Sequence, residues 1–111
     1  MTPRARLVVL ISGHGSNLQA ILDACASGEV NAAVVAVISN RSEAFGLERA
    51  RQIGVPALVL PKLKDQDRNT YDARLADLVL AYQPDWVVLA GWMRLLSMSF
   101  LSHFPNRVLN L

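Results

Sequence analysis

Cysteine is nearly absent from this sequence, and charged residues are scarce. Cys25 is the single cysteine among 111 residues, which excludes an internal disulfide and a zinc site built from several cysteines. Only 18% of the residues are charged, and the net charge of +2 is too small an excess to indicate nucleic-acid binding. With no signal-peptide pattern after Met1, we expect a cytoplasmic protein without a nucleic-acid partner.

Long hydrophobic runs are also missing, although 52% of the residues are hydrophobic. The longest apolar runs are residues 7–11, 32–38 and 86–90, each far shorter than the roughly 20 residues that a membrane span needs. This composition excludes intrinsic disorder and a membrane-embedded protein. Short unbroken apolar runs are typical of strands buried on both faces of a parallel sheet.

Apolar runs alternate with segments of helical periodicity along the whole chain. We expect strands at residues 7–12, 33–39, 57–60, 85–90 and 107–111, and helices at about 16–27, 43–53, 68–82 and 97–104. Ser16 or Asn17 is expected to cap the first helix, Gly28 to end it, and Ser42 to cap the second. The alternation predicts βαβ units with right-handed crossovers and a parallel sheet. We expect one α/β domain: a doubly wound, Rossmann-like, mostly parallel sheet of about five strands, in the order 3-2-1-4-5, with helices on both faces.

A turn with two glycines, Ser12-Gly13-His14-Gly15-Ser16-Asn17, joins the first strand to the first helix. Glycines let backbone N–H groups approach an anion, and the helix N-terminus adds roughly half a positive charge. The dinucleotide fingerprint fails because Leu18 stands where its third glycine belongs, and the Walker lysine is missing. The turn therefore favours a single phosphate monoester, and the alternative is an ordinary tight turn. We expect His14 to face solvent.

Chemically unusual residues follow other strands at the edge where α/β sheets bind ligands. After the fourth strand, Trp92-Met93-Arg94-Leu95-Leu96 places apolar groups beside a cation, which suits a flat aromatic ligand with an acidic tail. The alternative is a core-packing loop whose arginine reaches solvent. Asn110 ends the last strand, where an amide stabilises an oxyanion or simply terminates the strand. His14 and His103 are too few and too far apart in sequence to indicate a metal site.

Taken together, the motifs resemble those of the phosphoribosylglycinamide formyltransferases, folate-dependent enzymes of purine biosynthesis. The resemblance covers nearly the whole chain. It rests on VLISGHGSNLQA (9–20), SNR (39–41) with AFGLERA (44–50), DWVVLAGWMRLL (85–96) and FPNRVLNL (104–111).

The resemblance implies roles for residues in each motif. Gly15, Ser16 and Asn17 would hold the phosphate of glycinamide ribonucleotide, and Asn110 would be the catalytic asparagine that polarises the formyl carbonyl. The co-substrate would be 10-formyltetrahydrofolate, with no metal. The residues implied to bind it are Arg68, near the glutamate tail, and Trp92, Met93, Arg94, Leu95 and Leu96, around the pterin.

Members of this family continue past the asparagine with a catalytic histidine and, later, an aspartate. We therefore expect residues 1–111 to be the amino-terminal, nucleotide-binding part of a longer enzyme, a monomer or homodimer, and to be inactive alone. Two alternatives are formyltetrahydrofolate deformylase, which releases formate to water and needs no phosphate cradle, and a non-catalytic sugar-phosphate-binding module that binds no folate.

Overall fold

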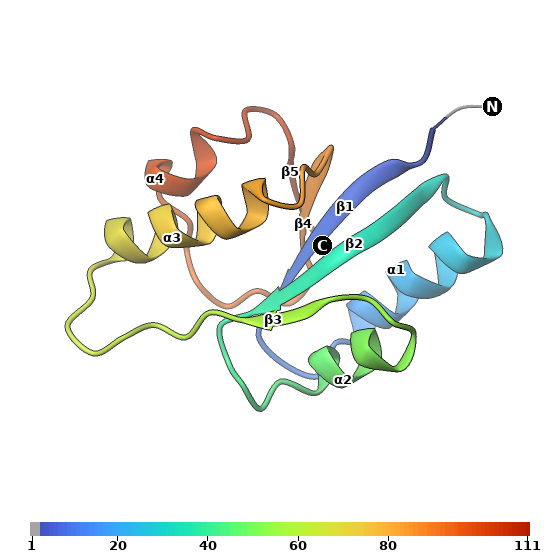
Figure 1. Ribbon diagram of the computed structural model, residues 1–111, viewed down its shortest axis with the longest axis horizontal. Coiled ribbons are helices and arrows are strands. Elements are labelled where there is room, and N and C mark those ends of the chain that lie inside the picture. Colours follow the sequence, from blue (N-terminus) through green and yellow to red (C-terminus); the bar gives the residue numbers. More distant parts are fainter. Residues whose placement is uncertain (1–2) are drawn as a thin grey trace.

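A five-stranded sheet with helices on both faces is the framework of the protein (Figure 1). The computed structural model describes residues 3–111. The elements in chain order are β1 (Ala5–Ile11), α1 (Ser16–Ser27), β2 (Ala32–Ser39), α2 (Phe45–Gln52), β3 (Ala57–Val59), α3 (Arg68–Leu80), β4 (Trp86–Leu89), α4 (Met98–Leu101) and β5 (Val108–Asn110). Neighbouring strands pair in parallel in the order β3-β2-β1-β4-β5, so the predicted topology is confirmed.

β1 is buried on both of its faces, which explains its unbroken apolar sequence. Val9 and Ile11 pack into the core beneath α1 and α2, whereas Val8 and Leu10 pack into the core beneath α3 and α4. All four side chains are fully buried. Figure 1 shows the two helix pairs on opposite sides of the sheet, and the sheet therefore separates two apolar cores.

One predicted helix end is confirmed, and two others differ from the predictions. Gly28 ends α1 in the left-handed conformation, with a φ of 82°, as predicted. Ser42 does not cap the second helix: the N–H of Ala44 donates to the carbonyl of Arg41, and this turn delays the start of α2 to Phe45. The fourth helix is a single turn, Met98–Leu101, and the residues after it form turns instead of continuing the helix.

α3 begins with a cap that we did not predict. The carboxylate of Asp67 accepts a hydrogen bond of 2.7 Å from the backbone N–H of Thr70. This bond satisfies one of the N–H groups that a helix leaves free at its N-terminus. The cap therefore sets the point at which Arg68 and the following residues enter the helix.

No helix within residues 3–111 combines the length and the apolarity that a membrane crossing requires.

The edge of the sheet at β5 leaves apolar surface exposed. Leu109 and Leu111 are 47% and 63% exposed, and they line an apolar groove with residues of α1 and β4. The groove has a volume of about 500 Å³. Asn17, in the first turn of α1, lies along the same groove, so the start of α1 and the end of β5 are near each other.

Candidate functional site

The glycine turn (residues 12–17) leads from β1 into the first turn of α1. Gly15 occupies the N-cap position with a φ of 86°, a left-handed conformation that glycine adopts without steric cost. The first four N–H groups of a helix have no partner inside it, and Ser16 and Asn17 supply two of them while their side chains stay exposed. This arrangement of free N–H groups at a helix N-terminus suits an anion.

The prediction that Ser16 or Asn17 caps α1 is wrong. The helix starts at Ser16, one residue earlier than a cap at Ser16 allows and two earlier than a cap at Asn17 allows, and its N-cap residue makes no side-chain hydrogen bond. Gly15 reverses the chain through its backbone conformation alone, so no capping oxygen is used. The consequence is that the hydroxyl of Ser16 and the amide of Asn17 remain available to a ligand.

The two glycines of the turn serve different purposes. A Cβ at Gly15 would lie 2.7 Å from the Cα of Gly46 in α2, so Gly15 is required for close packing of the turn against α2. The N–H of Gly46 donates to the carbonyl of Gly13 at 3.1 Å. A Cβ at Gly13 would meet nothing within 4 Å. The open space at the turn therefore lies beside Gly13.

Arg49, in α2, is the residue of this site that sequence reasoning missed. Its guanidinium donates to the carbonyl of His14 and to the side chain of Gln19. The available signal was the lack of a carboxylate three or four positions away, whereas Arg51 has Glu48 at that spacing and pairs with it at 3.8 Å. An arginine without such a partner on a helix is a candidate for a tertiary contact.

His14 is exposed, as predicted, and it is also held in place. Its ring stacks on Phe45 with centroids 5.3 Å apart and planes 16° from parallel. Its Nε2 lies 2.8 Å from Nη2 of Arg49. A guanidinium only donates, so this contact is a hydrogen bond in the tautomer that leaves Nε2 free to accept.

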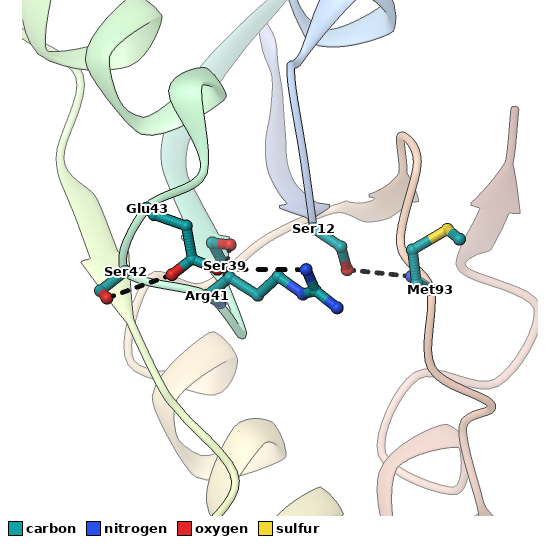
Figure 2. A network of polar contacts seen from close by, with 6 residues as sticks. All are labelled: Ser12, Ser39, Arg41, Ser42, Glu43 and Met93. Atoms are coloured by element: carbon teal, nitrogen blue, oxygen red, sulfur yellow. Dashed lines mark hydrogen bonds and ion pairs between the residues drawn. The ribbon is translucent and has the colours of Figure 1, made fainter.

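A serine follows or ends each of β1 and β2, and its hydroxyl accepts a hydrogen bond from a loop N–H group (Figure 2). Ser12 accepts a hydrogen bond of 2.9 Å from the N–H of Met93, which ties the glycine turn to the loop after β4. Ser39 accepts from the N–H of Arg41 at 3.0 Å, and the Arg41 side chain pairs with Glu43 at 4.0 Å. The strand ends that carry unusual residues in the sequence therefore do form one edge, as expected.

The loop after β4 and the end of β5 form a common pocket of about 450 Å³, the Asn110 pocket. Leu89, Trp92, Met93, Arg94, Leu95, Leu96, Leu101, Val108 and Asn110 line it. Asn110 itself is exposed on a three-residue edge strand. Met93 and Leu95 are also exposed, whereas Trp92 and Leu96 pack partly against the core under α3 and α4. The predicted loop residues and the predicted asparagine are thus brought together.

A second hollow of about 410 Å³, the basic pocket, adjoins the same loop. Arg68 and Arg94, both singled out in the sequence, line it with Lys62, which was not. Three cations around one hollow favour an acidic ligand group. Met93 and Leu95 complete its lining, so the basic pocket and the Asn110 pocket share residues.

Arg94 lies over an aromatic ring that is itself fixed. Its Cζ is 4.2 Å from the centroid of Tyr71, and the Tyr71 hydroxyl donates to the carbonyl of Leu60 at 2.6 Å. Burial raises the pKa of Tyr71 to about 12, a rise that the positive charge of Arg94 partly opposes. The stacking therefore holds Arg94 in the lining that the Asn110 pocket and the basic pocket share.

The chain is similar in sequence and in fold to known proteins. The formyl transferase family model matches residues 5–111. Phosphoribosylglycinamide formyltransferase of Escherichia coli is 51% identical over 105 residues, covering 95% of this chain and 50% of the relative, and that of Schizosaccharomyces pombe is 51% identical over 102 residues, covering 84% and 49%. The crystal structure of glycinamide ribonucleotide transformylase 1 from Symbiobacterium toebii superimposes with a TM-score of 0.94 at 49% identity, over 99% of this chain and 52% of that one. The chain spans about half the length of these relatives.

Proposed function

The chain belongs to the formyl transferase family, and from this premise we propose that it serves the transfer of a formyl group from 10-formyltetrahydrofolate to the amine of glycinamide ribonucleotide. The relatives with this activity in their name are about twice as long. We therefore propose that residues 1–111 supply the nucleotide-binding part of the enzyme and that the transfer requires the remainder of the catalytic domain. The single free cysteine favours the cytoplasm as its place of action.

The observation that supports this proposal most is the position of Asn110 between two kinds of binding surface. Asn110 lines a pocket with the loop after β4. Its neighbours Leu109 and Leu111 line a groove with Asn17 of the glycine turn. A folate on the loop side and a ribonucleotide phosphate on the turn side would meet at the end of β5.

The glycine turn is assigned the ribonucleotide phosphate. Gly15 gives the backbone its left-handed reversal, and the N–H groups of Ser16 and Asn17 are free at the start of α1. The Ser16 hydroxyl and the Asn17 amide add side-chain donors. One phosphate group can accept hydrogen bonds from all of these donors. A single phosphate also agrees with the sequence, which lacks the third glycine of the dinucleotide-binding motif.

The loop after β4 is assigned the folate. Trp92 and Leu96 give the Asn110 pocket an apolar wall, and exposed Met93 and Leu95 provide apolar surface for a flat ring. Arg68, Arg94 and Lys62 in the adjoining basic pocket would pair with the glutamate carboxylates. The two joined pockets therefore fit a ligand with an aromatic end and an acidic end.

Asn110 is assigned the chemical step. Its amide N–H would donate to the formyl oxygen, so that the amine of the ribonucleotide attacks a polarised carbonyl carbon. The new C–N bond forms, the oxyanion rests on the amide, and the bond from carbon to the folate N10 then breaks. The attacking amine loses one proton and N10 gains one. No covalent enzyme intermediate forms.

The test uses two proteins. The 111-residue chain is expected to bind glycinamide ribonucleotide and a folate analogue without transferring formyl groups. A chimera that joins residues 5–111 to the remaining half of the Escherichia coli relative is expected to catalyse transfer. Asn110→Ala in the chimera is expected to lower kcat by about 100-fold or more, with little change in ribonucleotide KM.

Three outcomes would overturn the proposal. Retention of kcat in the Asn110→Ala chimera would remove the asparagine from the mechanism. Formate release that does not depend on ribonucleotide would indicate a deformylase. Ribonucleotide binding by the 111-residue chain without any folate binding would indicate a sugar-phosphate-binding module.

A further inference from the structure

We propose that Arg49 is the positioning residue of the ribonucleotide phosphate: it holds the glycine turn in its anion-binding shape and gives it positive charge. The identity of the anion as a ribonucleotide phosphate rests on the proposed function. The claim that Arg49 holds the turn rests on contacts within the chain. Arg49 lies on α2, outside the strand-to-helix turn that it supports.

Arg49 bridges the two sides of the phosphate-binding residues. Its Nε donates to the carbonyl of His14 at 2.9 Å, just before Gly15, and its Nη2 lies 2.8 Å from Nε2 of the same histidine. Its Nη1 donates to Oε1 of Gln19 at 3.1 Å, one helical turn after Gly15. The three donors of one planar group therefore fix the entry to α1 and its first turn relative to each other.

Packing around Arg49 leaves the guanidinium little freedom. Its Cδ would be 3.3 Å from a Cβ at Gly15, so its aliphatic stem lies against the turn backbone. Its Cζ lies 5.0 Å from the centroid of the Phe45 ring, the same ring on which His14 stacks. The side chain is only partly exposed. The turn, His14 and Arg49 are thus joined by direct contacts to the start of α2.

The charge of Arg49 has no partner of opposite sign within residues 3–111. Its partners are a backbone carbonyl, the His14 ring nitrogen and the Gln19 amide, and none of them is a carboxylate. Neither nearby carboxylate forms an ion pair with it: Glu48 pairs with Arg51, and Asp23 is linked to Arg49 only through the Gln19 amide, which accepts from Arg49 and donates to Asp23. An uncompensated cation beside the positive end of α1 is unfavourable by itself and becomes favourable when an anion binds there. This excess of positive charge is independent of the loop geometry and points to an anionic ligand.

The variants separate positioning from charge. Arg49→Gln removes both, and Arg49→Lys keeps the charge but cannot make three planar contacts. Arg51→Gln is the matched control, because it removes the same charge from the same exposed helix and breaks only a pair with Glu48. The affinities of the 111-residue chain for inorganic phosphate and for glycinamide ribonucleotide are measured at constant low ionic strength.

We expect Arg49→Gln to weaken both affinities about tenfold, Arg49→Lys to weaken them by an intermediate factor, and Arg51→Gln to change them less than twofold. Folate-analogue affinity should stay unchanged in all three variants. The proposal is overturned if Arg49→Gln has no more effect than Arg51→Gln, or if Arg49→Lys restores full affinity.

A second measurement distinguishes failure of this inference from failure of the proposed function. If the unaltered chain binds neither phosphate nor ribonucleotide, the assigned function of the turn is wrong. Amide hydrogen exchange at residues 15–18 then still tests the positioning role: Arg49→Gln should accelerate it, and Arg51→Gln should not. Unchanged exchange in Arg49→Gln would show that Arg49 does not hold the turn.

Discussion

The carboxylate of Asp72 accepts two hydrogen bonds of 2.7 Å from Ser97, one from its backbone N–H and one from its hydroxyl. Asp72 is fully buried in the second turn of α3, and Ser97 is the N-cap of α4. Together with the bond from Met93 to Ser12 and the stacking of Arg94 on Tyr71, this contact holds the loop after β4 at three points. Contacts within the chain therefore preorganise the loop that lines the pocket assigned to the folate.

Replacing Asp72 by Ala should destabilise the protein and loosen this loop. The N–H and hydroxyl of Ser97 would lose their acceptor in a partly buried place, which costs about 1–3 kcal/mol of unfolding free energy. Urea unfolding measures the loss, and a folate analogue should bind more weakly. Asp77→Ala is the control, since Asp77 is exposed on the same helix. Equal effects of the two substitutions would contradict the role of the buried contact.

The two glycines of the glycine turn should respond differently to alanine. Gly15→Ala forces a left-handed conformation and a contact with Gly46, and we expect a loss of about 3 kcal/mol. Gly13→Ala meets open space and should change stability by less than about 0.5 kcal/mol. Phosphate affinity measured on the folded Gly13→Ala variant then reports on anion access to the turn. A stable Gly15→Ala protein would show that the turn does not depend on this backbone reversal.

Tyr71 should make the protein sensitive to alkali. Its pKa is raised from 10.0 to about 12 in the folded state, so the folded chain holds the phenol proton more tightly than the unfolded chain. This contribution is complete below the unfolded pKa and is lost as the pH rises through the folded one. Tyr71→Phe loses the bond to Leu60, about 1 kcal/mol, and should show a shallower decline of stability in this alkaline range. Denaturant unfolding of both proteins at several alkaline pH values measures the difference, and parallel pH profiles would contradict it.

Asp67 should contribute the opposite dependence at acid pH. The hydrogen bond from the Thr70 N–H lowers the pKa of this carboxyl below its ordinary value. A lowered folded pKa stabilises the protein above the unfolded pKa, and the stabilisation is lost as the pH falls through the folded pKa. Asp67→Asn keeps a capping oxygen without the titration. Its melting temperature should therefore fall less than that of the unaltered chain between neutral pH and about pH 3. An equal fall in both proteins would argue against the cap.

Much of the fold could be predicted from the sequence, because its signals are local. Short apolar runs indicated the strands, the alternation with helical periodicity indicated right-handed βαβ units and a parallel sheet, and the expected strand order 3-2-1-4-5 is the one observed. The helix caps were predicted less well. Gly28 ends α1 as expected, whereas the roles of Ser16, Asn17 and Ser42 were wrong because backbone turns at Gly15 and at residues 41–44 begin those helices.

The order of the residues is enough to specify the layered α/β architecture and the chemical character of each strand end. Which residues meet at that edge depends on how the chain folds. Ser12 and Met93 are 81 positions apart, His14 and Arg49 are 35 apart, and Asp72 and Ser97 are 25 apart. Periodicity reports only on neighbours within a few turns of a helix or along one strand. Contacts between separate loops depend on the twist of the sheet and the packing of whole helices, so the partners of Arg49 and Asp72 could be found only in the folded chain.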